Sequence, residues 1–382
     1  MTSRWSSTGA LCVAVTLVLC WTTAPLWSSQ SAAAQAGDPA AALFKAADAV
    51  RVAGRTDEAI SKYQRIMAEY PSSPWAARSA LETARSMVGQ GKWEPAMRQM
   101  EIVRLGFKGT PEAEQALERN TILHRLRLRQ GQPVYRFART AVDGRALLRR
   151  VINVDMDSKG RVYVATRQSY VVLNESGGIV SQEPTNDLRG LAMHGDVPIW
   201  FYERGTREGT NALVSIAISD QNRQREPDIQ AGAVVSGEAM LIADRRTKAV
   251  HRVSMSGGYQ SRLALVDAAR IAVGPLGEAA AIERETGALL LIAPDGKTRP
   301  IPAAGPGYMF RGPIDVAFDP LGHLYVLERD SVVIFAPTGE FLSVFAPGSA
   351  AGAFRTAAAF HVDAAGRLYV YDEDAERLQV FQ

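Results

Sequence analysis

The spacing of apolar residues changes once along the chain, and this change predicts two kinds of structure. Residues 38–132 are rich in Ala, Glu, Arg and Met and show no alternating pattern, which is typical of helices. From Val151 onward, apolar and polar residues alternate in short runs that end at glycine-rich turns, as they do in β-strands. The sequence therefore predicts a multidomain protein, with an α-helical domain followed by an all-β domain.

The helical segment contains an internal repeat in which small and apolar residues recur after 37 positions. The first unit carries Gly54, Ala59, Tyr63, Ile66 and Pro71, and the second carries Gly91, Ala96, Met100 and Val103. This pattern resembles the tetratricopeptide repeat, in which a small residue closes a turn, Ala lets two helices approach, and Pro ends the second helix. A further helix is expected over residues 112–129, with Thr110 as its cap.

The tetratricopeptide resemblance implies a concave groove that holds a peptide or a partner segment. Residues 59–71 also resemble the repeats of periplasmic cell-envelope assembly proteins. The alternative is that these few repeats only pack against the next domain, because about three repeats are usually needed for independent stability. Both interpretations stay open from the sequence.

A longer repeat is superimposed on the alternating strands of the β domain. Residues 154–164, 316–326 and 360–370 each read as a strand, an Asp-x-x-Gly turn and a second strand. With weaker copies, the turn glycines are Gly160, Gly195, Gly237, Gly277, Gly322 and Gly366, at intervals of 35 to 45 residues. A propeller blade of four strands occupies about 40 to 50 residues. Six copies therefore predict a six-bladed β-propeller.

Each copy is expected to continue into a third strand, over residues 171–173, 213–216, 250–253, 289–292, 332–335 and 378–381. The last copy ends at Gln382 without a fourth strand, and we expect residues 134–138 to supply it and close the ring. The unit resembles the NHL repeat, whose propellers include RNA binders, protein binders, lactonases and amidating lyases. The resemblance thus implies a fold and leaves the function open.

The N-terminus has the features of a secretory signal peptide. Arg4 supplies a positive charge, residues 10–21 form an apolar run, and an Ala-Gln-Ala site follows. Cleavage there places the mature protein in the periplasm or outside the cell and leaves it without cysteine, because Cys12 and Cys20 both lie in the signal. An uncleaved membrane anchor and lipidation at Cys20 are the alternatives; after cleavage we expect no membrane span.

The expected domains are a signal peptide over residues 1–36, a tetratricopeptide-like helical domain over 37–132 and an NHL-like propeller over 133–382. The 43 basic and 40 acidic side chains nearly balance, and the basic residues lack interleaved aromatics. Both features argue against a nucleic-acid partner. A protein or peptide partner is expected, with a glycan as the second choice.

The second strand of most blades ends in an acidic residue followed by Arg. Equivalent positions of successive blades lie around one rim, so we expect a ligand-binding ring of Arg167, Glu203, Arg204, Asp244, Arg245, Glu283, Arg284, Glu328, Arg329 and Asp372. Its carboxylates could hold a divalent cation, and its arginines could bind a carboxylate or phosphate. The alternative is that each carboxylate accepts hydrogen bonds from its own turn and is neutralised by a neighbouring Arg.

The sequence has no recognisable catalytic motif. Its five histidines lack metal-ligand spacing, and no nucleophile elbow, phosphate loop or dinucleotide fingerprint stands in a suitable context. His323 is expected to be exposed in a turn. His361 lies in an inner strand, where it could face the channel as a metal ligand or general base; the alternative is an ordinary sheet histidine.

The leading hypothesis is an exported, non-catalytic binding or scaffold protein. It would engage protein or glycan partners through the propeller face and the helical groove, without a cofactor. The alternative hypothesis is a lactonase-like hydrolase or lyase with a divalent cation, such as calcium, bound in the channel.

Overall fold

The computed structural model describes residues 38–382 except 130–132, 144–149, 221–222, 236–238 and 349–351. The expected signal peptide lies outside the described residues. No helix in the described part of the chain combines the length and the apolar character needed to cross a membrane. By their contacts, Ala40–Gln382 form one compact unit, which contains both the helices and the strands.

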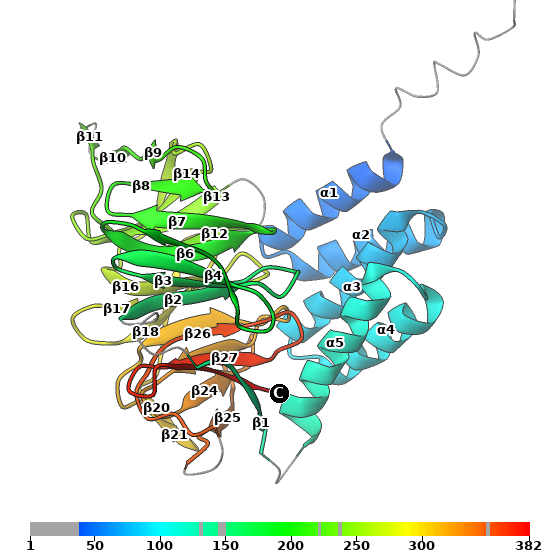
Figure 1. Ribbon diagram of the computed structural model, residues 1–382. Helices are drawn as coiled ribbons and strands as arrows, with labels where there is room; N and C mark the ends of the chain where they lie inside the picture. The colour runs from blue at the N-terminus through cyan, green and yellow to red at the C-terminus, as the bar shows by residue number, and fades with distance from the viewer. Residues whose placement is uncertain (1–37, 130–132, 144–149, 221–222, 236–238, 349–351) are drawn as a thin grey trace, which may run out of the picture. The chain divides into compact units, whose positions relative to one another are not determined.

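Five α-helices precede the strands in the described chain (Figure 1): α1 (Pro39–Val52), α2 (Thr56–Glu69), α3 (Pro74–Gly89), α4 (Trp93–Gly106) and α5 (Pro111–Leu123). A π-helical turn, His124–Leu128, continues α5. The side chains of Ser73 and Thr110 cap α3 and α5, and each of these helices has Pro in its first turn.

The repeated positions of the helical segment are its core. Ala59, Tyr63 and Ile66 of α2 are fully buried, and so are their counterparts in α4, Ala96, Met100 and Val103. Gly54 and Gly91 have φ angles of +79° and +75°, which Gly adopts without the steric cost of a side chain. The 37-residue repeat therefore corresponds to equivalent buried positions in two helices.

Six four-stranded antiparallel sheets follow, which confirms the six-bladed β-propeller. Their strands, from the channel outward, are β2 (Val151–Met156), β3 (Val162–Thr166), β4 (Ser169–Leu173) and β5 (Ile179–Pro184) in blade 1; β6 (Leu188–His194), β7 (Val197–Tyr202), β8 (Gly205–Glu208) and β9 (Val214–Ser215) in blade 2; β12 (Ile229–Val235), β13 (Ala239–Asp244), β14 (Ala249–Ser254) and β15 (Tyr259–Ala264) in blade 3; β16 (Ala268–Val273), β17 (Ala279–Glu283), β18 (Leu289–Ile292) and β19 (Thr298–Ile301) in blade 4; β22 (Asp315–Phe318), β23 (Leu324–Leu327), β24 (Val332–Phe335) and β25 (Phe341–Phe345) in blade 5; and β26 (Ala357–Val362), β27 (Leu368–Asp372), β28 (Arg377–Phe381) and β1 (Phe137–Asp143) in blade 6. Two short hairpins, β10 (Ile218–Asp220) with β11 (Arg223–Arg225) and β20 (Ala304–Gly305) with β21 (Tyr308–Met309), lie between blades in the sequence.

The ring closes as the sequence predicts, with an N-terminal strand beside the last one. β1 pairs antiparallel with β28, and Arg136 and Gln382 exchange two backbone hydrogen bonds of 3.0 Å. The strand begins at Phe137, three residues later than expected, and extends to Asp143. Tyr135 lies before the strand, with its ring buried and its hydroxyl donating to the carbonyl of Gly366 at 2.8 Å.

The third strand of blade 2 differs from the predicted one, and that prediction was wrong. It is β8, Gly205–Glu208, and the expected segment 213–216 instead contains the outer strand β9. Tyr202 pairs directly with Gly205, so Glu203 and Arg204 form a tight turn. The polar sequence of β8 lacks the apolar alternation by which the other third strands were found.

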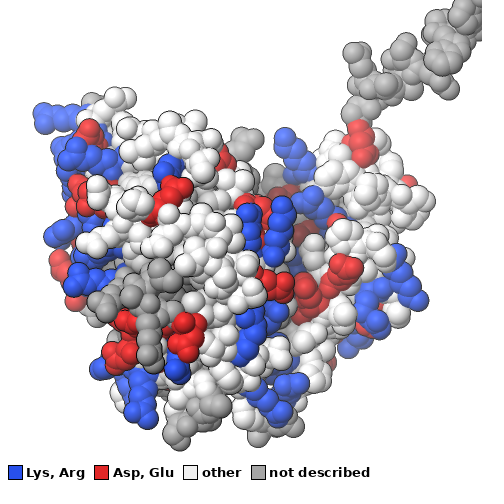
Figure 2. Space-filling view, in the orientation of Figure 1, with Lys and Arg blue, Asp and Glu red and all other residues white. Residues whose placement is uncertain are grey.

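The side chains that join the blades are mostly apolar, and the surface carries both charges. Figure 2 shows acidic side chains interspersed among Lys and Arg along the left edge of the propeller, in agreement with the near-neutral composition.

The blades follow each other around the ring in sequence order, since neighbouring inner strands contact each other in the order β2, β6, β12, β16, β22 and β26. Hydrophobic clusters fill the space between neighbouring blades.

The helices contact the turns that follow three inner strands. Leu321, in the turn after β22, is fully buried within the apolar core of the helices. Arg125 donates a 2.6 Å hydrogen bond to the carbonyl of Gly366 after β26. Arg51 of α1 reaches the carbonyl of Pro275 after β16 at 3.4 Å. The helical segment is therefore attached at the turn end of the channel.

Candidate binding site in the propeller channel

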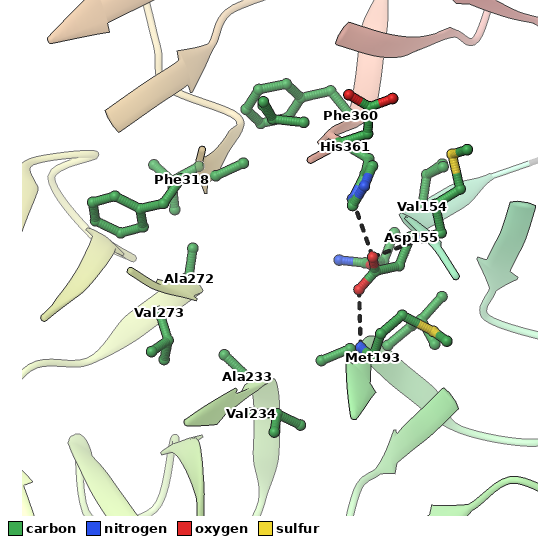
Figure 3. A pocket seen from close by; sticks show the side chains of 18 of the residues that line it. Val154, Asp155, Met193, Ala233, Val234, Ala272, Val273, Phe318, Phe360 and His361 are labelled. Atoms are coloured by element: carbon green, nitrogen blue, oxygen red, sulfur yellow. Dashed lines mark hydrogen bonds and ion pairs between the residues drawn. The ribbon is translucent and has the colours of Figure 1, made fainter. Parts of the chain in front are cut away.

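A cavity of about 760 Å³ lies along the axis of the propeller. All six inner strands line it, and Glu118 of α5 contributes at the end where the helices attach. Figure 3 shows its walls, with Asp155 and His361 on one side and Phe318, Ala272 and Val273 on the other. The cavity is of the size that small-molecule sites usually have.

Strand register defines which channel residues are equivalent between blades. The residues paired with Tyr163, Ile199, Leu241, Ala280, Tyr325 and Tyr369 of the second strands are Asp155, Ala192, Ala233, Ala272, Ala317 and His361. Four blades thus carry Ala where two neighbouring blades carry Asp and His. The small side chains leave space in front of the two polar ones.

Asp155 is held by donors from three blades. Its carboxylate accepts hydrogen bonds from the backbone N–H of Met156 at 2.8 Å and of Met193 at 3.0 Å, and it lies 3.1 Å from Nδ1 of His361 (Figure 3). The His361 and Asp155 side chains are 20% and 18% exposed, so both reach the cavity. Nε2 of His361 has no hydrogen-bond partner among the described residues.

The protonation of His361 depends on Asp155. Burial of the ring disfavours its charged form, but the charge and hydrogen bond of Asp155, with a smaller contribution from Asp363, raise the pKa of His361 above its usual value. A carboxylate that accepts from Nδ1 also fixes the tautomer and the orientation of the ring. The pair can therefore accept or donate one proton through Nε2 at a defined place in the channel.

We call the residues at one equivalent position of the six inner strands a level of the channel. A second level with polar residues lies nearer the strand ends that face away from the helices. Asn153, Arg270 and Asp315 occupy equivalent positions of blades 1, 4 and 5, and Arg189 enters from blade 2. Nε of Arg270 is 3.9 Å from Oδ1 of Asp315, and Arg189 donates to Glu203 at 3.3 Å. Burial raises the pKa of Asp315 to about 6, although Arg270 and the amide of Val316 act against this.

At the opposite end of the channel, three turns carry aspartates whose hydrogen bonds are made within the turn. Asp157, Asp319 and Asp363 each accept two backbone N–H bonds within their own turn and one bond from the side chain four residues later. That side chain is Arg in two turns and His323 in the third. His323 is therefore fully buried, 2.7 Å from Asp319, and the expectation that it is exposed was wrong.

The carboxylates of the expected ring are largely engaged by their own blades. Asp244 accepts hydrogen bonds from the backbone N–H of Asp228 and the hydroxyl of Thr247. Asp372 accepts from the backbone N–H of Arg355 and the hydroxyl of Thr356. Glu328 accepts from the backbone N–H of Arg311 and the hydroxyl of Ser331. These three are buried. Glu283 accepts from Thr286 of its turn, and Glu203 lies 3.7 Å from Arg204 and binds Arg189.

The arginines of the ring lie mostly in solvent. Arg167, Arg204, Arg245 and Arg329 are exposed, while Arg284 is half-buried and 3.1 Å from Asp267. Among the described residues, no group of three or more His, Cys, Asp or Glu side chains is placed to hold a metal ion. The geometry thus does not bring the ring carboxylates together.

Sequence reasoning named His361 but missed its partner Asp155 and the arginines Arg189 and Arg270. Asp155 stands two residues before the repeat aspartate of its turn, so it resembled part of the repeat. The signal is that Asp and His stand at a position where the other inner strands have Ala. It becomes visible only when all six inner strands, including those of the weaker repeat copies, are aligned.

No family model and no curated protein sequence matches this chain. Among solved structures it is similar to XC5397 of Xanthomonas campestris, described as a gluconolactonase, with 14% identity over 66% of this chain and 95% of that one and a TM-score of 0.50. A Bacteroides thetaiotaomicron protein of unknown function gives 11% identity, coverage of 65% and 75%, and a TM-score of 0.49. A streptogramin B lyase gives 7% identity over 65% of this chain and 97% of that one, with a TM-score of 0.44. At 14% identity, the likeness to XC5397 supports the propeller fold alone.

Proposed function

We propose that this protein is a binding protein and that the channel of its propeller is the ligand site. The observation that carries the proposal is the cavity of about 760 Å³, in which apolar walls surround a few oriented polar groups. A ligand can be oriented by Asp155 and His361 and packed against the four alanines of their level. This site replaces the ring of rim residues as the place where we expect a small ligand, or a projecting group of a partner, to bind.

The experiment is a screen of dipeptides, monosaccharides and small organic acids by ligand-observed NMR. Ala272→Trp adds an indole to a small residue of the channel wall and is expected to abolish every specific signal. Leu265→Trp is the matched control, because Leu265 is 70% exposed. Circular dichroism checks that both variants fold. Ligands that bind Ala272→Trp as well as they bind the unchanged protein would place the site elsewhere and refute the proposal.

A second candidate function is acid–base catalysis in the same channel, and the Asp155–His361 pair is the observation that favours it. A carboxylate on Nδ1 and an unengaged Nε2 are the arrangement of a general base. A lactonase-like reaction with a channel cation, the alternative from the sequence, would place the cation beside Asp155, whose carboxylate would then have to exchange one of its present donors for the metal. Metal analysis of the purified protein tests this: stoichiometric calcium or zinc that Asp155→Asn loses would favour the enzyme, and its absence would oppose it.

The finer features inferred from the sequence remain part of this proposal. We propose that the helices act as a tetratricopeptide-like repeat over residues 37–132, that residues 133–382 are an NHL-like propeller, and that a signal over residues 1–36 exports the protein to the periplasm or beyond. The helical groove would then hold a peptide segment of a partner. Ile102 and Leu105, on one side of α4 and 58% and 52% exposed, are apolar residues available for that contact.

A further inference from the structure

Two arginines enter the channel near the end that faces away from the helices, and neither is fully neutralised. Arg270 donates to the carbonyl of Ala269 at 3.1 Å, and its nearest carboxylate, Asp315, is at 3.9 Å, beyond hydrogen-bonding distance. Arg189 makes one hydrogen bond, to Glu203 at 3.3 Å. Nε of each guanidinium has no hydrogen-bond partner among the described residues. Both side chains line the cavity.

The blade between them leaves room for an anion. β12 of blade 3 lies between β6 and β16 and carries Ala231 and Gly232 at this level. A Cβ at Gly232 would lie 2.2 Å from the ring of Phe201, so only Gly fits. Ala231 and Gly232 both line the cavity and are small and uncharged, so neither position supplies a carboxylate that would compete for the arginine donors.

The charges at the channel mouth also bear on whether the ligand is an anion. Three carboxylates of the rim, Asp244, Glu328 and Asp372, are buried and bonded to their own blades. Four rim arginines are exposed: Arg167, Arg204, Arg245 and Arg329. Asp315 accepts a hydrogen bond from the amide of Val316, and at 3.9 Å from Nε of Arg270 it leaves that donor open to a ligand. Exposed arginines such as Arg167, Arg245 and Arg329 can attract an anion to this end, whereas Arg204 is paired with Glu226 at 3.2 Å.

We propose that the channel ligand is a small organic acid whose carboxylate binds between Arg189 and Arg270. This rests on the channel being the ligand site. The level of Asp155 and His361 is two residues further along the strands, which is about 7 Å at the usual rise per residue. The ligand therefore carries a second hydrogen-bonding group, such as a hydroxyl or amide, about 7 Å from its carboxylate. Its uncharged part packs against the alanines of that level.

Matched acid and neutral probes test this class: N-acetyl-Ala-Ala against its C-terminal amide, and glucuronate against glucose, by calorimetry. At least one acid is expected to bind about tenfold or more tightly than its neutral partner, because hydrogen bonds to charged groups are the stronger ones. Arg270→Gln is expected to weaken the acid by about 10- to 100-fold, and Arg270→Lys by less. Arg65→Gln, on the exposed face of α2, is the control and leaves affinity unchanged.

The outcomes separate this inference from the proposed function. If the amide or glucose binds as tightly as the acid, Arg270→Gln has no effect and Ala272→Trp still abolishes binding, the channel is the site but the ligand is not an acid. If none of the four probes and no member of the screening set binds, both proposals fail. If Arg270→Gln does not fold, Arg189→Gln, with the same expected direction, decides.

Discussion

At the scale of single residues, the channel owes its character to a few departures from a repeated pattern. Four blades have Ala at the level where Asp155 and His361 stand, and the same strands elsewhere place apolar residues against neighbouring blades. A buried charged group is costly unless it is paired. Asp155 meets this requirement with three donors, whereas Asp315 accepts a hydrogen bond from the amide of Val316 and lies 3.9 Å from Arg270.

His361→Gln tests the coupling to Asp155. The pKa of His361 is raised in the folded protein, so the protonated ring contributes stability that is fully present below the usual pKa near 6.5 and lost as pH rises through the folded value. The variant should therefore lose more unfolding free energy at pH 6 than at pH 9, measured by urea denaturation. An equal loss at both pH values would mean that the Asp155 contact does not favour the charged ring. Asp363 is the other acidic group acting on His361.

Asp315→Asn tests the opposite case. Burial raises the pKa of Asp315 from 3.8 to about 6, so ionising it costs more in the folded protein than in the unfolded chain. That cost develops as pH rises from about 4 to about 6 and stays constant above. Relative to the unchanged protein, the unfolding free energy of the variant should therefore rise by up to roughly 3 kcal/mol between pH 4 and pH 8. Parallel stability curves from urea titrations at the two pH values would contradict this.

At the scale of elements, glycine turns decide how closely neighbouring blades approach. Gly177, in the turn between β4 and β5, has a φ of +85°, and a Cβ there would lie 2.4 Å from the carbonyl oxygen of Ala141 in β1. This turn of the first blade thus packs against the strand that closes the last one. Gly195 has a φ of +59° but no atom within 4 Å of its Cβ position.

Gly177→Ala and Gly195→Ala separate backbone strain from crowding. Both variants should lose about 1 kcal/mol of unfolding free energy, because Ala is strained in a left-handed backbone conformation. Only Gly177→Ala also pushes on the closing strand, which should cost about 1 to 3 kcal/mol more. Urea denaturation of the two variants measures the difference. If they are equally destabilised, the Gly177 turn does not constrain closure.

At the scale of the whole molecule, the helices and the propeller share a core. Leu321 comes from a propeller turn but is buried among helical residues, and Arg125 lies 4.9 Å from the ring of Tyr135 while it binds Gly366. One channel end is therefore occupied by contacts within the chain. We therefore expect a ligand to approach from the rim end.

Leu321→Ala tests the shared core. Removing a buried Leu side chain is expected to cost about 2 to 5 kcal/mol. Leu265→Ala, at a position that is 70% exposed, should change stability by less than about 0.5 kcal/mol. Thermal and urea unfolding give both values, and limited proteolysis should cut the helices of Leu321→Ala sooner. A neutral Leu321→Ala would mean that helices and propeller are stabilised independently.

The sequence by itself determined the helical repeat, the number of blades and the closing strand, because these depend on local periodicity and on turns that recur at intervals of 35 to 45 residues. His361 was also visible, since an inner strand places every second residue toward a neighbour or the channel. The third strand of blade 2 was missed because its polar residues carry no alternating signal.

Only the tertiary structure decided which polar side chains meet. Asp155 and His361 are 206 positions apart and touch because the first and last blades become neighbours when β1 closes the ring. The rim carboxylates looked available in the sequence but accept hydrogen bonds from their own blades, whereas the channel arginines stood in weak copies with no motif. Periodicity specifies the elements, but the circular arrangement of blades sets the contacts, and these contacts make the candidate site.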